Sequence, residues 1–167
     1  MSATNLQLEQ SVEEFLTFKL GNEIYGVEIL KVQEIRSYET ATKIANTPDF
    51  IKGVINLRGS IVPIVDLRVR FRLSQVEYNA FTVVIILNLQ ARTIGIVVDG
   101  VSDVVALSKE QIGPVPDLVS GIDTQYLLGL ASIEDLMIIL VNIEQLMTSQ
   151  VMAIVEATSS SESIAST

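Results

Sequence analysis

The sequence contains no cysteine, no histidine and no tryptophan among its 167 residues. Without cysteine the chain can form no disulfide and has no thiol chemistry, which suits the cytoplasm. Without histidine it lacks the commonest general base and the commonest ligand of transition metals. Catalysis would have to rely on carboxylates, lysine or tyrosine alone. These absences argue against an enzyme and predict that the chain holds no metal and no cofactor.

Long apolar runs are also missing. The longest uncharged stretch runs from Tyr78 to Ala91, which is 14 residues, whereas a membrane-spanning helix needs about 20. The first ten residues lack both the basic start and the apolar core of a signal peptide. We therefore expect a cytoplasmic protein that does not insert into a membrane.

Positive charge is scarce in the second half of the chain. Residues 1–83 carry nine basic and ten acidic side chains, whereas residues 84–167 carry two basic and ten acidic ones, so the total is −9. Nucleic-acid binding requires a basic surface. The charge therefore disfavours nucleic acid as a partner, and it disfavours anionic membrane surfaces for the same reason.

What the chain has in quantity is apolar side chains, at 49% of residues with a mean hydropathy of +0.45. The pattern is mostly that of strands: Leu16, Phe18 and Leu20 alternate with polar residues. Gly21 and Asn22 then form a predicted two-residue hairpin loop. We expect an all-β protein with few helices.

The sequence repeats itself. Residues 25–35 align with residues 94–104 at an offset of 69 (95 minus 26). Residues 53–55 and 64–67 align with 129–131 and 140–143 at an offset of 76 (129 minus 53). An insertion of seven residues in the second copy explains the difference. Two copies made of short strands predict two small barrels.

Polar residues at the ends of apolar runs predict short helices. Asp66 and Asn142 each follow such a run and are expected to cap a helical turn. Ser108 and Gln111 have the spacing of a capping box. A last helix is predicted from about Ser149 to Glu156. We expect residues 1–13 and the Ser/Thr-rich residues 158–167 to be disordered tails.

Arg58 lies at a tight reversal between two apolar strand-like runs, framed by Asn56 and Gly59. A guanidinium held on such a frame can form a bidentate contact with a partner. The alternative is a salt bridge within the fold, for instance to Glu34. The residues alone leave both open. Val32 and Ile35 are similarly open between core packing, which is commoner, and contact with a partner.

Two further groups have a functional and a structural interpretation. Asp99 and Asp103 are four residues apart and could act as paired carboxylates, but turn and cap roles are commoner for aspartate. Arg68, Arg70 and Arg72 alternate with apolar residues and could form an anion-binding ridge. We favour an exposed strand edge whose charges prevent aggregation, because the chain is so acidic.

Together, several runs resemble the CheW family of chemotaxis coupling proteins, and the resemblance covers roughly Glu14 to Ala157. Each run is short, but the set is specific. The runs are Glu14-Phe15-Leu16, Tyr25-Gly26, Ile29 to Arg36, Ile44 to Pro48, Phe50 to Gly53, Asn56-Leu57-Arg58-Gly59, Ile61 to Arg68, Ile96 to Val104 and Ile138 to Glu144.

This resemblance implies a fold of two tandem five-stranded SH3-like β-barrels with short helices, including a C-terminal one. It places a CheW-like domain at residues 14–157, with approximate halves at 14–80 and 81–145 between which strands can be exchanged. CheW-like proteins are non-catalytic adaptors in the cytoplasm. They connect methyl-accepting chemoreceptors to the regulatory domain of the histidine kinase CheA, in clusters at the membrane. CheV and CheA also contain such domains, but no receiver or kinase domain accompanies this one, which favours a free-standing coupler.

The resemblance also implies which residues meet each partner. A groove between the barrels is expected to accept a helix of the receptor tip, with Arg58 on its rim. A generic SH3-like peptide binder is disfavoured, because aromatics make up only 5% of the chain. The implied receptor-binding residues are Glu34, Arg58, Val83, Ile94, Gly95 and Val101, and the implied kinase-binding residues are Leu16, Ile29 and Val32.

Overall fold

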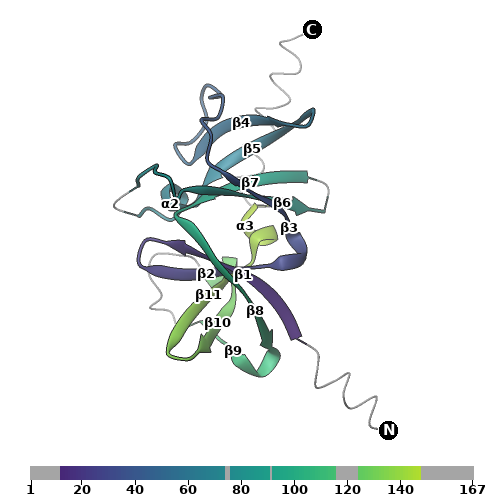
Figure 1. Ribbon diagram of the computed structural model, residues 1–167, viewed down its shortest axis with the longest axis vertical. Coiled ribbons are helices and arrows are strands. Elements are labelled where there is room, and N and C mark those ends of the chain that lie inside the picture. Colours follow the sequence, from purple (N-terminus) through teal and green to yellow (C-terminus); the bar gives the residue numbers. More distant parts are fainter. Residues whose placement is uncertain (1–11, 74–75, 91, 116–123, 148–167) are drawn as a thin grey trace.

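The computed structural model describes residues 12–73, 76–90, 92–115 and 124–147, which form two β-sheets and a few short helices (Figure 1). The prediction of an all-β chain is confirmed. The helix predicted from about Ser149 to Glu156 lies outside the described residues, as do both predicted tails except for Val12 and Glu13. These two residues already belong to the first strand.

Sheet A has six strands in the order β8-β1-β2-β11-β10-β9. Its first hairpin turns at Gly21 and Asn22, as the alternation predicted, and Gly21 has the positive φ that the turn requires. The two-residue strand β9 adds a sixth strand to the five expected. The strands are β1 Val12–Leu20, β2 Glu23–Glu28, β8 Gly100–Ser108, β9 Ile112–Gly113, β10 Leu127–Ile133 and β11 Leu136–Val141.

Sheet B has five strands in the order β3-β6-β7-β5-β4. Short helical turns connect or follow the strands of both sheets. The strands of sheet B are β3 Val32–Ser37, β4 Ile51–Leu57, β5 Ser60–Asp66, β6 Val83–Leu89 and β7 Arg92–Val98. The helical turns are η1 Ile29–Lys31, α2 Leu67–Arg70, η2 Lys109–Gln111, η3 Thr124–Tyr126 and α3 Ile143–Met147.

The internal repeat is visible in both sheets. Strands β8, β1, β2, β11 and β10 follow one another in sheet A as β3, β6, β7, β5 and β4 do in sheet B. β11 runs parallel to β2, with Leu140 opposite Gly26, and β5 runs parallel to β7, with Ile64 opposite Gly95. Gly53 and Gly129, which the repeat equates, lie at equivalent register shifts and both have positive φ.

The sheets do not follow the two halves of the sequence. Sheet A combines the hairpin β1–β2 of the first copy with the later strands of the second copy, and sheet B combines the hairpin β6–β7 with β3, β4 and β5. The chain therefore crosses between sheets twice, from β2 to β3 and from β7 to β8. Each sheet depends on both copies.

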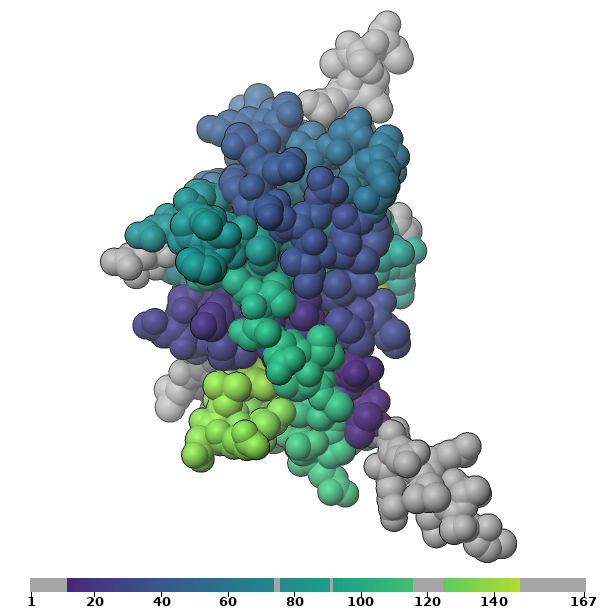
Figure 2. Space-filling model, in the orientation of Figure 1, coloured from purple at the N-terminus to yellow at the C-terminus, as the bar shows by residue number. Residues whose placement is uncertain are grey.

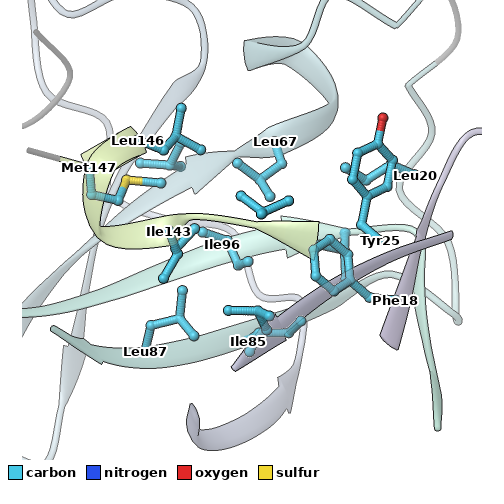
Figure 3. Close-up of a cluster of buried hydrophobic side chains, with 14 of the residues drawn as sticks. Phe18, Leu20, Tyr25, Leu67, Ile85, Leu87, Ile96, Ile143, Leu146 and Met147 are labelled. Carbon is cyan, nitrogen blue, oxygen red and sulfur yellow. The ribbon is translucent and has the colours of Figure 1, made fainter. Parts of the chain in front are cut away.

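A shared core fills the space between the sheets. It combines aromatic and aliphatic side chains of β1 and β2 with those of β6, β7 and the helices α2 and α3 (Figure 3). On the other side of each sheet lies a smaller cluster, around Ile64 and Val84 in sheet B and around Phe15 and Leu140 in sheet A. Successive residues of β6 and β7 point alternately into the shared core and into the sheet B cluster, as expected for strands buried on both faces. This core holds the two sheets as one body.

The predicted caps are present. Asp66 Oδ1 accepts a hydrogen bond from the backbone N–H of Arg68 at 3.0 Å, at the start of α2. Asn142 Oδ1 accepts one from the backbone N–H of Gln145 at 3.1 Å, at the start of α3. The Gln111 side chain accepts one from the backbone N–H of Ser108 at 2.9 Å. These bonds satisfy donors that a helix end leaves without an intrahelical partner.

Candidate functional site

The turn between β4 and β5 presents Arg58 as the sequence predicted. Arg58 and Gly59 both have positive φ, at 51° and 89°, and the backbone N–H of Gly59 donates to Asn56 Oδ1 at 2.9 Å. Positive φ at both central residues is the geometry of the tight turns that join twisted strands. The side chain of Arg58 is 64% exposed at this rigid turn.

Arg58 forms an ion pair and hydrogen bond with Glu34 of β3, and Arg36 lies 3.5 Å from the other oxygen of Glu34. The hydrogen bond from Arg58 lowers the pKa of Glu34, so this carboxylate stays ionised. Of the two interpretations left open by the sequence, the intramolecular salt bridge is present. Since the guanidinium is still largely exposed, the pair also forms a charged surface cluster on which a partner can dock.

This charged cluster joins the two outer strands of sheet B. In the strand order β3 and β4 are the first and last members, and the Arg58–Glu34 pair connects the β4–β5 turn to β3. A backbone bridge between Thr42 and Val54 holds the connection from β3 to β4 against β4. The positions of Arg58 and Glu34 are thus fixed by the sheet, and their charges face solvent.

The other four predicted receptor-binding residues do not form one exposed surface with this cluster. Ile94 is fully buried in the shared core, and its neighbour Gly95 is buried on the opposite face of β7, against Ile64. Val83 and Val101 are half-buried and pack against the shared core. Direct contact with a partner is therefore open to Val83 and Val101, whereas Ile94 and Gly95 shape the strand beneath them.

Of the predicted kinase-binding residues, Ile29 and Val32 lie at the first crossover, whereas Leu16 lies on β1 opposite Val27. Leu16 is buried in the shared core, and Ile29 and Val32 are half-buried against it. Between them Leu30 is 96% exposed on η1, and sequence reasoning did not single it out. Residues 29–32 are three apolar residues and one lysine. Because a helical turn interrupts the strand alternation here, this pattern does not indicate which side chain faces outward. Whether these residues meet a kinase stays a prediction.

The sequence-based interpretation of the three arginines is wrong. Arg68 and Arg70 lie in the helical turn α2, not in a strand edge, and the side chain of Arg68 has no exposed surface. Arg70 lies between the rings of Phe50 and Tyr126, at 5.6 and 5.7 Å from their centres. Neither an anion-binding ridge nor a protective edge is present, because the cap at Asp66 turns the chain into a helix where strand alternation was assumed.

Arg68 instead organises a buried polar network. Its Nε and Nη2 donate to the two oxygens of Asp66 at 3.0 and 2.9 Å, and its Nη1 donates to Asp99 Oδ1 at 2.9 Å. Tyr78 Oη also donates to Asp66 Oδ2, at 2.7 Å. Burial acts to raise the pKa of Asp66, but the bonds from Arg68 and Tyr78 outweigh it and lower that pKa. A fully paired bidentate arginine makes this network a structural one.

Asp99 and Asp103 do not converge. The two oxygens of Asp99 accept from Arg68 Nη1 and from the backbone N–H of Gly21, at 2.9 and 2.7 Å. Asp103 Oδ1 accepts from the backbone N–H of Val104 at 2.8 Å, on the exposed side of β8. The catalytic pair considered from the sequence therefore has no common site, and each carboxylate accepts hydrogen bonds from other groups of the fold.

Two packed β-sheets with an internal repeat, and a charged cluster on a rigid exposed turn, define a class of protein that acts by binding other proteins in a fixed arrangement. On the face shown in Figure 2, residues of sheet B (blue and teal) occupy the upper part, and residues of β8, β10 and β11 (green to lime) occupy the lower part. Among the described residues, no helix has the length and apolar character needed to cross a membrane.

Comparison with known proteins identifies the family. The CheW-like domain family matches residues 14–151. The chain is 59% identical over 144 residues to the chemotaxis protein CheW of Klebsiella aerogenes, which covers 86% of this chain and 87% of that protein. It is 35% identical over 137 residues to the chemotaxis protein CheW of Rhizobium meliloti, covering 82% and 88%.

A solved structure agrees with the fold. The crystal structure of the scaffolding protein TtCheW from Thermoanaerobacter tengcongensis superimposes with a TM-score of 0.72 at 35% identity, covering 78% of this chain and 84% of that one. The chain belongs to the CheW family of chemotaxis proteins. It is a non-catalytic scaffolding protein whose partners are proteins of chemotaxis signalling.

Proposed function

We propose that this chain couples methyl-accepting chemoreceptors to the histidine kinase CheA, in the cytoplasm, at receptor clusters on the membrane. It binds the helical cytoplasmic tip of the receptors with one surface and the regulatory domain of the kinase with another. The family assignment supports this proposal, and so does the packing of both sheets around one shared core. Such a body can hold two partners in a fixed relative geometry.

The observation that carries the proposal is the charged cluster of Glu34, Arg36 and Arg58. It combines exposed charge with a rigid frame, which is the usual combination at a binding surface. We assign the receptor contact to this cluster together with Val83 and Val101, with Ile94 and Gly95 supporting them from within. We assign the kinase contact to the first crossover, where Leu16 supports Ile29 and Val32.

Coupling follows from differential binding. An adaptor changes the output of a kinase only if it binds the active and inactive states with different free energies. Each single contact can be weak, since micromolar binding corresponds to only about −8 kcal/mol. Repeated receptor and kinase contacts then add up through multivalency to a stable array.

Replacing Arg58 with alanine tests the receptor contact. We expect the affinity for a receptor-tip fragment to fall by about 1–3 kcal/mol, or roughly 5- to 150-fold in Kd, the scale of an interface anchor. The midpoint of thermal unfolding should hardly change, because an exposed ion pair contributes at most about 1 kcal/mol. Isothermal titration calorimetry and thermal unfolding measure the two effects.

Arg72→Ala is the matched control for Arg58→Ala. Arg72 is also an exposed arginine with positive φ, at 59° against 51° for Arg58, so the backbone cost of the substitution is the same. Arg72→Ala should leave receptor binding unchanged. If Arg58→Ala unfolds the protein while the folded fraction keeps its affinity, the arginine is structural and the assignment fails.

A further inference from the structure

The two crossovers between the sheets are held by different ion pairs. The repeat equates Arg68 of α2 with Glu144 of α3 (68 plus 76), and Asp99 with Leu30, next to Lys31 (30 plus 69). Arg68 pairs with Asp99 at the second crossover, and Glu144 pairs with Lys31 at the first, at 3.3 Å. The charges are reversed, but each pair links a helical turn to a crossover.

Only one of these two pairs is anchored in the interior. The Arg68 side chain has no exposed surface and is held on its other edge by Asp66, so this end of the pair is interior although the Asp99 side chain is 32% exposed. Lys31 and Glu144 are 21% and 30% exposed, and Lys31 is shared with Glu28 at 3.4 Å. Solvent screens such exposed pairs and reduces their contribution, whereas a buried bidentate arginine keeps a fixed direction. The second crossover is therefore the stiffer of the two.

Asp99 links the fixed side chain of Arg68, in sheet B, to sheet A. Its Oδ1 is bound by Arg68, which is anchored at the end of β5 in sheet B. Its Oδ2 accepts from the backbone N–H of Gly21 at 2.7 Å, and its own N–H donates to the carbonyl of Lys19 at 3.0 Å. Lys19 and Gly21 belong to the β1–β2 hairpin of sheet A. One carboxylate thus joins a buried group of sheet B to a turn of sheet A.

Apolar packing holds the hairpin through Leu20, which is fully buried in the shared core, but the turn itself borders a cleft. A cleft of about 530 Å³ lies between the β1–β2 turn and residues 77–81, and Gly21 and Asp99 both line it. The shared core fixes the distance between the sheets, but apolar contact is non-directional. Directional hydrogen bonds at the edge of the core can fix the angle between the two sheets.

We propose that Asp99 is a positioning residue that fixes the orientation of sheet A relative to sheet B. This inference rests on the proposed function in one respect: the two partner surfaces lie on elements that the two sheets position. If Asp99 is lost, the charged cluster of Glu34, Arg36 and Arg58 keeps its shape within sheet B, but its geometry relative to Leu16 and Val101 of sheet A loosens. Each partner then still binds, while receptor state is transmitted to the kinase less effectively.

Asp99→Asn is the test variant and Asp103→Asn is its matched control. Asparagine offers one oxygen acceptor, so it cannot accept from both Arg68 and Gly21 with separate oxygens. Asp103 lies on β8, four residues after Asp99, and within the part of the chain that the structure describes its carboxylate accepts from the backbone N–H of the next residue, Val104. Both substitutions remove one negative charge, so net charge is matched.

The distance between the sheets is the direct readout. The chain has no cysteine, so spin labels can be placed at Asn88→Cys on β6 and Ser132→Cys on β10, both exposed. Pulsed electron–electron double resonance should give a narrow distribution of the distance between the two labels for the parent and for Asp103→Asn. The distribution should broaden or shift for Asp99→Asn.

Coupling is the second readout, measured as the change in CheA activity caused by a receptor fragment. We expect it to fall about tenfold for Asp99→Asn, within the usual range of coupling between sites. The affinity for each partner alone should stay within about threefold of the parent, a difference below 1 kcal/mol. A purely structural role would lower the unfolding midpoint without separating coupling from binding.

An unchanged distance distribution in Asp99→Asn overturns the proposal, as does a loss of coupling no larger than that in Asp103→Asn. The proposed function fails separately, if the parent protein binds neither the kinase domain nor the receptor fragment. In that case the distance measurement still decides whether Asp99 orients the sheets.

Discussion

Replacing Arg68 with alanine is expected to lower the free energy of unfolding by about 3–5 kcal/mol, the usual cost of breaking a buried ion pair by removing one partner. Arg68 and Asp66 are both fully buried, and their side chains are joined by two hydrogen bonds. Alanine would leave the Asp66 carboxylate in the interior with only Tyr78 and its capping bond. Since a domain of this size is stabilised by about 5–15 kcal/mol, this loss would bring the protein close to the point at which a large fraction of the molecules is unfolded.

Urea unfolding followed by circular dichroism measures this loss. Arg72→Ala, an exposed arginine one turn further along, should change the free energy of unfolding by less than about 0.5 kcal/mol. Adding Asp66→Asn to Arg68→Ala should recover part of the stability, because a neutral amide costs less to bury than an unpaired carboxylate. Equal stability of Arg68→Ala and Arg72→Ala would refute the structural role of the network.

Gly53→Ala is expected to lower the free energy of unfolding by about 2–4 kcal/mol, from strain at positive φ and from overpacking. Gly53 has a φ of 133°, and a Cβ placed there would lie 2.0 Å from the carbonyl oxygen of Thr42. Thr42 and Val54 exchange two backbone hydrogen bonds at 2.9 Å. The clash is with backbone, so no side-chain rotation can relieve it, and the bridge between Thr42 and Val54 must shift.

Gly59→Ala separates the two causes. Gly59 also has positive φ, at 89°, but a Cβ there meets nothing within 4 Å. It should therefore cost only the conformational strain, about 1 kcal/mol. Both variants are compared by urea unfolding at the same pH. If they lose the same stability, the close approach of Thr42 to Gly53 does not constrain the fold.

The sequence predicted local structure well because local rules govern it. The hairpin at Gly21, the caps at Asp66 and Asn142, and the equivalence of Gly53 with Gly129 follow from turn chemistry and from matched apolar positions. The exchange of strands between the sheets was allowed but not determined. A repeat indicates which strands are equivalent, but it does not say which copy each strand pairs with.

The extension of the buried network from Arg68 to Asp99 was missed because these two residues are far apart in sequence. Arg68 and Asp99 are separated by 31 residues, and only the return of the chain from β7 to β8 brings them together. Alternating arginines also suggested a strand, although the predicted cap at Asp66 already indicated a helical turn there. The positions of Ile94 and Leu30 depended in the same way on which face each strand turns toward the shared core.

Co-elution of three components tests the central claim most directly. The protein is mixed with the regulatory domain of CheA and a receptor-tip fragment, and size-exclusion chromatography with light scattering gives the mass of each species. The account predicts one species that contains all three, because different residues are assigned to the two partners and one rigid body holds both sets. It is contradicted if either partner displaces the other, or if this chain elutes alone in the presence of both.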